Sequence, residues 1–119
     1  MRLALAAVLA AAVVLPGAAL AAQPPAEAAP ALDAIKSRMR VERNISFRKV
    51  KINAAGDVCG TVSVGSGRDM EFLLAKSSGE LWINEAPTEP NSYFGYGLSN
   101  VRRSTERADY QVWKACQKG

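Results

Sequence analysis

The 119-residue chain contains no histidine. Without an imidazole, the usual Ser-His and Cys-His nucleophile systems lose their general base. Only two cysteines are present, and they do not form the close Cys-x-x-Cys spacing that is typical of zinc ligands. The composition therefore removes most hydrolase mechanisms and predicts a protein that is not an enzyme and that has no metal site and no cofactor.

Paired carboxylates are the alternative that would still support catalysis. Asp69 and Glu71 are two residues apart, and Glu85 and Glu89 lie near an aromatic segment. Two carboxyl groups at a suitable separation can serve as general acid and base. Acidic side chains on strand faces and loops are usually solvated, however, and we therefore expect no catalytic residues here.

One long apolar run is present, and it stands at the N-terminus over residues 3–15, directly after Arg2. Pro16 follows this run, and residues 19–21 are the small residues that a signal peptidase accepts. This pattern predicts a signal peptide over residues 1–21. A transmembrane anchor is less favoured, because a spanning helix takes about 20 apolar residues. We therefore expect a bacterial envelope protein that is periplasmic or secreted after cleavage.

Export into an oxidising compartment predicts a disulfide bond between Cys59 and Cys116. Closing a loop of that length would stabilise the fold by about 4 kcal/mol in the chain-entropy model. Reactive thiols are the alternative interpretation. They are disfavoured because neither a close cysteine partner nor a histidine is present.

The mature chain is long enough for one domain. Residues 22–30 are rich in Ala and Pro, which predicts a disordered lead-in. Residues 31–119 then form a single domain. Its first element is a helix over residues 31–40, because three apolar residues recur there at i, i+3 and i+7: Leu32, Ile35 and Met39.

The middle of the chain alternates between apolar and polar residues, which predicts β-strands. In the first strand the phase changes across Arg48 and Lys49, which indicates a β-bulge. Short segments with Gly, Asn and Ser separate the strands and favour turns. We expect an antiparallel meander of about four strands, over residues 45–52, 58–64, 70–74 and 81–83.

The chain is expected to end in a second helix. Residues 86–100 are rich in Pro, Gly and Asn and predict a loop. Asn100 or Ser104 can cap the helix that follows. Its predicted apolar stripe consists of Ala108, Val112 and Cys116, widened by Tyr110 and Trp113. The predicted fold class is α+β, with the C-terminal helix tethered by the disulfide.

Two segments, Phe47-Arg48-Lys49-Val50 and Val58-Cys59-Gly60-Thr61-Val62, are followed by a closing helix with Trp113 and Cys116. In these features the chain resembles small exported proteobacterial proteins of unknown function that carry Phe-Arg-x-Val and Val-Cys-Gly-x-Val motifs and a C-terminal helical cysteine. The resemblance covers roughly residues 32–116. It implies the α+β arrangement and the disulfide, and it carries no activity.

Half of the aromatic residues lie close together, in and beside a segment that contains Gly95 and Gly97. Tyrosine and tryptophan in a glycine-rich loop are typical of recognition surfaces. The alternative is that the aromatic rings fold back to cover the sheet. The candidate binding residues are Trp82, Tyr93, Phe94 and Tyr96.

A basic segment precedes and includes the first strand, and the only acidic residue within it is Glu42. Such a segment favours contact with an acidic partner or an anionic membrane surface, although a solvated face is the alternative. Nucleic acid is not expected as a partner in the envelope. The candidate contacts are Lys36, Arg38, Arg40, Arg43, Arg48, Lys49 and Lys51.

These features together favour a non-enzymatic binding module of the inhibitor, immunity or accessory type, which uses the aromatic loop to bind an envelope protein. The alternative is a structural or stress-related envelope factor that associates with anionic surfaces through its basic face.

Overall fold

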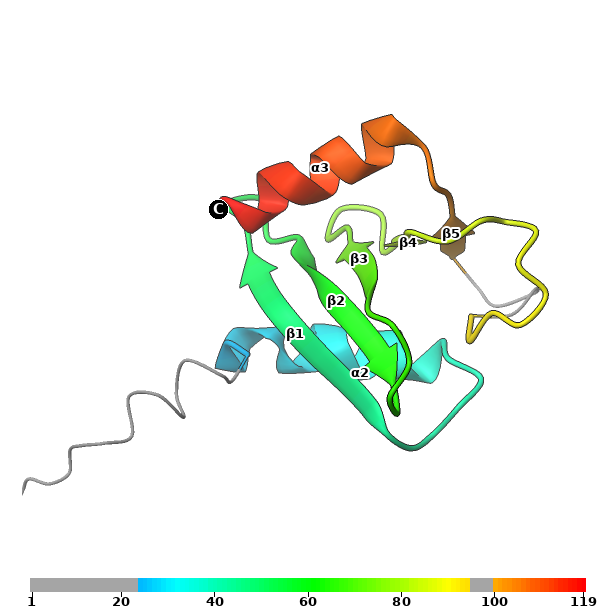
Figure 1. The fold of residues 1–119 in the computed structure, drawn as a ribbon. Helices are drawn as coiled ribbons and strands as arrows, with labels where there is room; N and C mark the ends of the chain where they lie inside the picture. The colour runs from blue at the N-terminus through cyan, green and yellow to red at the C-terminus, as the bar shows by residue number, and fades with distance from the viewer. Residues whose placement is uncertain (1–23, 95–99) are drawn as a thin grey trace, which may run out of the picture.

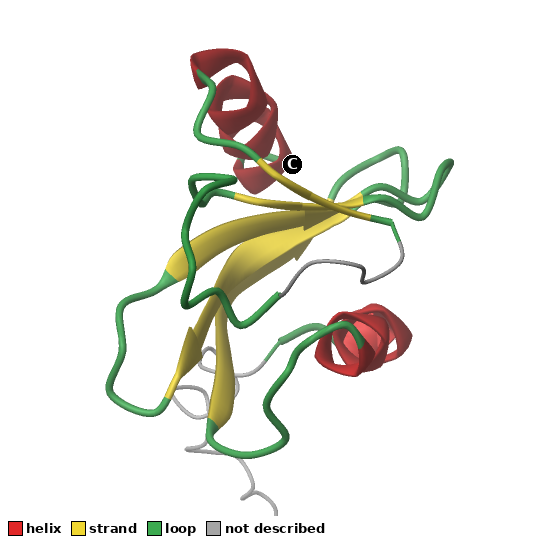
Figure 2. Ribbon diagram, turned by 90° about the vertical axis from the view of Figure 1, so that its right-hand side faces the viewer, coloured by secondary structure: helices red, strands yellow, loops and turns green. Residues whose placement is uncertain are grey.

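In the computed structural model the described residues are 24–94 and 100–119. The expected signal peptide, residues 1–21, lies outside them. The described residues form three layers, in which a twisted sheet separates two helices (Figure 1). Figure 2 shows one helix on each face of the sheet. This arrangement confirms the predicted α+β fold class.

The sheet has the strand order β1-β2-β3-β4-β5 within the described residues. The first four strands form the predicted antiparallel meander. The last strand is an addition, because it pairs with β4 in parallel and was expected to be loop or helix. The strands are β1 (Ile45–Ile52), β2 (Val58–Val64), β3 (Met70–Leu74), β4 (Leu81–Ile83) and β5 (Val101–Arg103).

The predicted bulge in β1 is confirmed. The pairing of β1 with β2 shifts register between Arg48 and Lys51. Lys49, inside this interval, has a φ of 56°, which is an uncommon conformation for a residue with a side chain. Opposite the bulge, a Cβ atom on Gly60 would lie only 2.8 Å from the Arg48 carbonyl oxygen. The close approach of the two backbones therefore requires glycine at position 60.

The helix α2 (Ala29–Ser37) covers one face of the sheet and follows a short 3-10 turn, η2 (Ala26–Ala28). The prediction of a disordered lead-in over 22–30 is therefore wrong for its described part from Ala26 onward. The side chain of Ala28 is fully buried in the core, which explains the order of this segment. Pro30 is compatible with the first turn of a helix, where the missing N–H needs no partner.

The helix α3 (Arg107–Gln117) packs against β1, β2 and β3 on the other face. It begins later than expected, after Glu106, and no side chain caps it. Its predicted apolar stripe is partly wrong, because Val112 is 58% exposed and Ala108 is also exposed. The helix instead turns Trp113 and Cys116 toward the sheet. The disulfide bond of Cys116 and a hydrogen bond from the Trp113 indole to β2 set its rotation.

Two clusters of buried side chains follow from the three layers. The larger cluster lies between α2 and the sheet and includes Leu32, Ile35 and Phe72. The smaller cluster lies between α3 and the sheet and consists of Cys59, Leu73, Trp82, Trp113 and Cys116. In the part of the chain that the structure describes, no helix is both long and apolar enough to cross a membrane.

Candidate functional site

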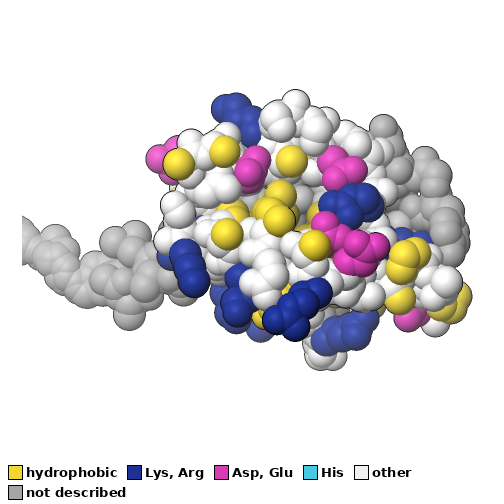
Figure 3. All heavy atoms as spheres, turned by 90° about the horizontal axis from the view of Figure 1, so that it is seen from above, with side chains coloured by type: hydrophobic (Ala, Val, Ile, Leu, Met, Phe, Trp, Pro, Cys, Tyr) yellow, Lys and Arg dark blue, Asp and Glu magenta, His cyan; other side chains and the backbone are white. Residues whose placement is uncertain are grey.

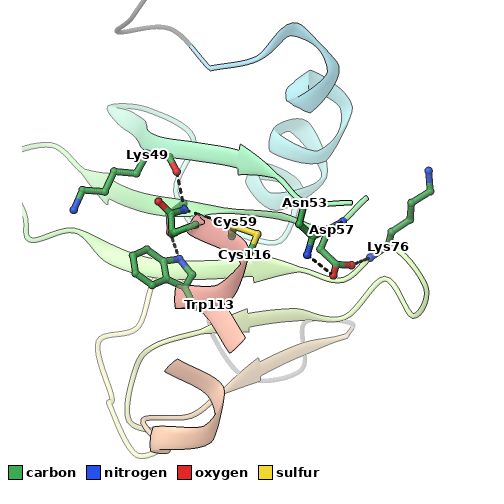
Figure 4. Close-up of a disulfide and its surroundings, with 9 residues drawn as sticks. Lys49, Asn53, Asp57, Cys59, Lys76, Trp113 and Cys116 are labelled. Carbon is green, nitrogen blue, oxygen red and sulfur yellow. Dashed lines mark hydrogen bonds between the residues drawn. A yellow bond between two sulfur atoms is a disulfide. The ribbon is translucent and has the colours of Figure 1, made fainter. Parts of the chain in front are cut away.

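The predicted disulfide is confirmed, and it joins β2 to α3 (Figure 4). Cys59 and Cys116 are both buried, with 0% and 2% of their surface exposed. The Trp113 indole N–H donates a hydrogen bond to the Gly60 carbonyl oxygen at 2.9 Å. Gln117 donates one to the carbonyl oxygen of the bulge residue, Lys49, at 2.8 Å. These bonds attach the helix beside the disulfide, which indicates a structural role for the sulfur pair.

The candidate aromatic residues divide into two groups. Trp82 and Phe94 are only 3% and 1% exposed, which corrects the prediction that they form part of a recognition surface. Trp82 belongs to the cluster under α3, and Phe94 belongs to the cluster under α2. In a domain this small, both faces of the sheet need large side chains to cover them. Tyr93 is half-buried, and Tyr96 lies outside the described residues.

A buried ion pair organises the loop that leads to Tyr93. The Arg103 guanidinium lies 3.4 Å from the Glu85 carboxylate, and the two side chains are only 7% and 4% exposed. Arg103 also donates hydrogen bonds to the carbonyl oxygens of Pro87 at 2.7 Å and Glu89 at 3.1 Å. These contacts from β5 hold the first half of the loop in one conformation.

The second half of the same loop is held by a hydroxyl group. Ser92 donates a hydrogen bond to the Glu85 carboxylate, and its oxygen accepts one from the backbone N–H of Phe94 at 3.0 Å. The backbone N–H of Arg40 donates to the Tyr93 carbonyl oxygen at 2.7 Å. Reasoning from sequence missed Arg103 and Ser92, because partners distant in sequence give no local pattern.

Tyr93 lies between two hollows of the surface. One, of about 280 Å³, is lined by Arg40, Val41 and residues 90–93. The other, of about 200 Å³, lies toward the turn between β2 and β3 and includes Arg68 and Glu89. The half-buried ring and its polar surroundings thus form a surface that is partly apolar and carries charges of both signs. We call this surface, centred on Tyr93, the Tyr93 surface.

Three of the seven candidate basic side chains make internal contacts. Arg38 donates to the Gly79 carbonyl oxygen at 2.8 Å, and Arg48 pairs with Asp69 at 3.1 Å. The Lys36 ammonium group lies over the Phe47 ring, 5.9 Å from its centre. Six of the seven are exposed: Lys36, Arg40, Arg43, Arg48, Lys49 and Lys51. Figure 3 shows Lys and Arg side chains gathered along one side of the molecule. Because β1 is an edge strand, lysines on it also oppose pairing with other chains.

The carboxylates that were considered for catalysis have structural partners. Asp69 pairs with Arg48, and Glu71 accepts a hydrogen bond from the Asn84 amide at 2.8 Å. Glu85 pairs with Arg103 in the buried network. Among the residues that the structure describes, no three Cys, Asp or Glu side chains are grouped in a way that could hold a metal ion.

The fold and its contacts define a small α+β domain whose second helix is pinned by a buried disulfide. No family model, curated protein or solved structure matches the chain.

Proposed function

We propose that the protein is a non-enzymatic binding module of the bacterial envelope, of the inhibitor, immunity or accessory type. It reaches the periplasm or the exterior through the signal peptide over residues 1–21, and its partner is an envelope protein. The observation that carries the proposal is the buried Glu85–Arg103 ion pair, which fixes the loop that presents Tyr93.

Holding a loop with a buried ion pair has a large desolvation free energy. Removing two charges from water costs several kcal/mol per ion, and apolar side chains often stabilise a fold as well or better. Such pairs do specify one conformation, because the geometry of charged hydrogen bonds is demanding. A rigid loop on a rigid scaffold is the usual setting of binding residues. Tyrosine is also among the residues enriched at protein interfaces.

A comparative pull-down from envelope extract tests the proposal. The baits are the mature protein, an Asn91→Arg variant and a Tyr110→Ala variant. Asn91 is exposed and lines both hollows beside Tyr93, whereas Tyr110 is on α3 and serves as the control. We expect a stoichiometric protein that wild type and Tyr110→Ala retain and that Asn91→Arg loses. Equal retention by all three baits, or no protein partner, would contradict the proposal.

A second candidate function is that of a structural or stress-related envelope factor held to anionic surfaces. The six exposed cations around α2 and β1 support it. Its test is retention on vesicles with anionic lipid, using a double Lys49→Gln, Lys51→Gln variant. Salt-sensitive retention that this variant loses, without any protein partner, would favour the second function over the first.

A further inference from the structure

A groove of about 240 Å³ opens beside α3, on the face of the sheet opposite to α2. The buried side chains of Leu73 and Trp82 line it, together with Val112. Val112 is 58% exposed and is the most exposed large apolar side chain in the described part of the chain. Figure 3, which views this face, shows apolar side chains at its centre with charged groups beside them. The groove is separate from the Tyr93 surface.

The charge of the groove is negative. Arg102 on β5 pairs with Asp109 at 2.9 Å and with Glu80 at 3.0 Å. One guanidinium therefore faces two carboxylates. Hydrogen bonds from Arg102 and then Ser104 hold the pKa of Asp109 below its usual value, so that Asp109 is ionised at neutral pH. Asp57 adds a third carboxylate to the lining.

Asp57 makes its contacts with neutral donors. Its carboxylate accepts hydrogen bonds from the Asn53 amide at 3.1 Å and from the Lys76 backbone N–H at 2.9 Å (Figure 4). Among the described residues, no Lys or Arg side chain forms an ion pair with Asp57. The lining thus carries three carboxylates against one guanidinium, beside apolar side chains.

We propose that this groove binds a basic, amphipathic segment of a partner protein. A lysine or arginine of that segment places its charge near Asp57 and Glu80, and its methylene stem lies along the apolar lining. A neighbouring apolar side chain of the segment covers Val112. Charge complementarity selects this occupant. Residues 22–30 of the chain itself contain Glu27 and no Lys or Arg, and Ala28 is already buried in the cluster under α2.

The test uses the mature protein and short fluorescent peptides, with binding measured by anisotropy at low salt. One peptide alternates lysine with leucine, one alternates lysine with serine, and one alternates glutamate with leucine. We expect saturable binding of the Lys-Leu peptide, binding of the Lys-Ser peptide that is weaker by about tenfold, and no binding of the Glu-Leu peptide. Equal affinity for the Lys-Leu and Lys-Ser peptides, or no saturable binding, would overturn the proposal.

Variants locate the bound peptide. Asp57→Asn removes one charge while keeping the acceptor oxygen, and it should weaken binding by about threefold. Val112→Ser removes apolar surface at an exposed site, and it should weaken binding by about fivefold. Glu27→Gln, on the opposite face, is the matched control and should bind as wild type does. Wild-type affinity in both groove variants would overturn the proposal.

Two further measurements test whether the variants are folded and whether the occupant is a second copy of the chain. Denaturant unfolding of each variant separates lost binding from lost folding, and Val112→Ser carries the test alone if Asp57→Asn unfolds. Analytical ultracentrifugation checks for a second copy of the chain as the occupant. Self-association that Asp57→Asn abolishes would replace the peptide segment with a second copy and overturn the proposal as stated.

Discussion

Replacing Gly60 with alanine adds a methyl group to β2, directed at the bulge in β1 and at the core. The added Cβ atom would lie 2.8 Å from the Arg48 carbonyl oxygen and 3.1 Å from the Phe72 ring. Real Cβ contacts essentially never lie under 3.0 Å, so the bulge in β1 must shift. Overpacking of this kind costs about 1 to 3 kcal/mol. The shift also disturbs the Gly60 carbonyl oxygen that accepts the Trp113 hydrogen bond, so we expect a loss near the upper end of that range.

Crowding reverses the usual effect of a change from Gly to Ala on the free energy of unfolding. The φ of Gly60 lies outside the left-handed region, and at an ordinary φ without crowding a change from Gly to Ala stabilises by about 0.4 to 1 kcal/mol. Gly65→Ala is the control, because Gly65 has a φ of 60° and open space around its Cβ position. It should cost about 1 to 2 kcal/mol from backbone conformation alone. Urea unfolding measures both, and a neutral or stabilising Gly60→Ala would refute the steric argument.

Three further predictions concern the disulfide and the ion pairs. Cys59→Ser and Cys116→Ser should each lower the free energy of unfolding by about 2 to 5 kcal/mol in denaturant unfolding. The double variant should lose no more than the worse single variant, because either change removes the same bond. The unmodified protein should show no free thiol. Arg103→Met should cost about 3 to 5 kcal/mol, because Glu85 is left buried without its cation, and adding Glu85→Gln should restore part of the loss in the same melts. Folding lowers the pKa of Asp109, so its contribution to stability is present above the unfolded pKa of about 3.9 and is lost as pH falls through the folded pKa. Asp109→Asn should therefore reduce the loss of unfolding free energy at acid pH. If Asp109→Asn loses stability at acid pH as wild type does, the argument on Asp109 is contradicted. If the losses of the two cysteine variants add in the double variant, the two cysteines are not partners.

Local chemistry along the chain was sufficient for most of the sheet. Period-2 alternation and the turn residues predicted β1 to β4, because a strand shows its two faces in consecutive residues. The change of phase at Arg48 and Lys49 predicted the bulge for the same reason. The presence of only two cysteines in a chain with a signal-peptide pattern left one partner for each, so the disulfide followed from counting.

Other features were beyond local pattern. The strand β5 is too short to show alternation, and it exists only because β4 offers it a free edge. The rotation of α3 depends on the disulfide and on the bond from Trp113 to Gly60, so Val112, which looked like a core residue, is exposed. The pattern of apolar residues in a helix shows which side chains can be buried. The layer against which the helix packs decides which of them are buried.

The binding surfaces show the same division most clearly. Aromatic clustering marked Trp82, Tyr93 and Phe94 alike, but the tertiary structure buries the first and the last and leaves only Tyr93 half-exposed. The pairing of Glu85 with Arg103 joins residues from a loop and a strand that no local period connects. The amino-acid sequence therefore determined the two helices, the first four strands and the covalent link between β2 and α3. Which side chains are exposed, and which charges meet, was decided by packing, because both depend on residues distant along the chain.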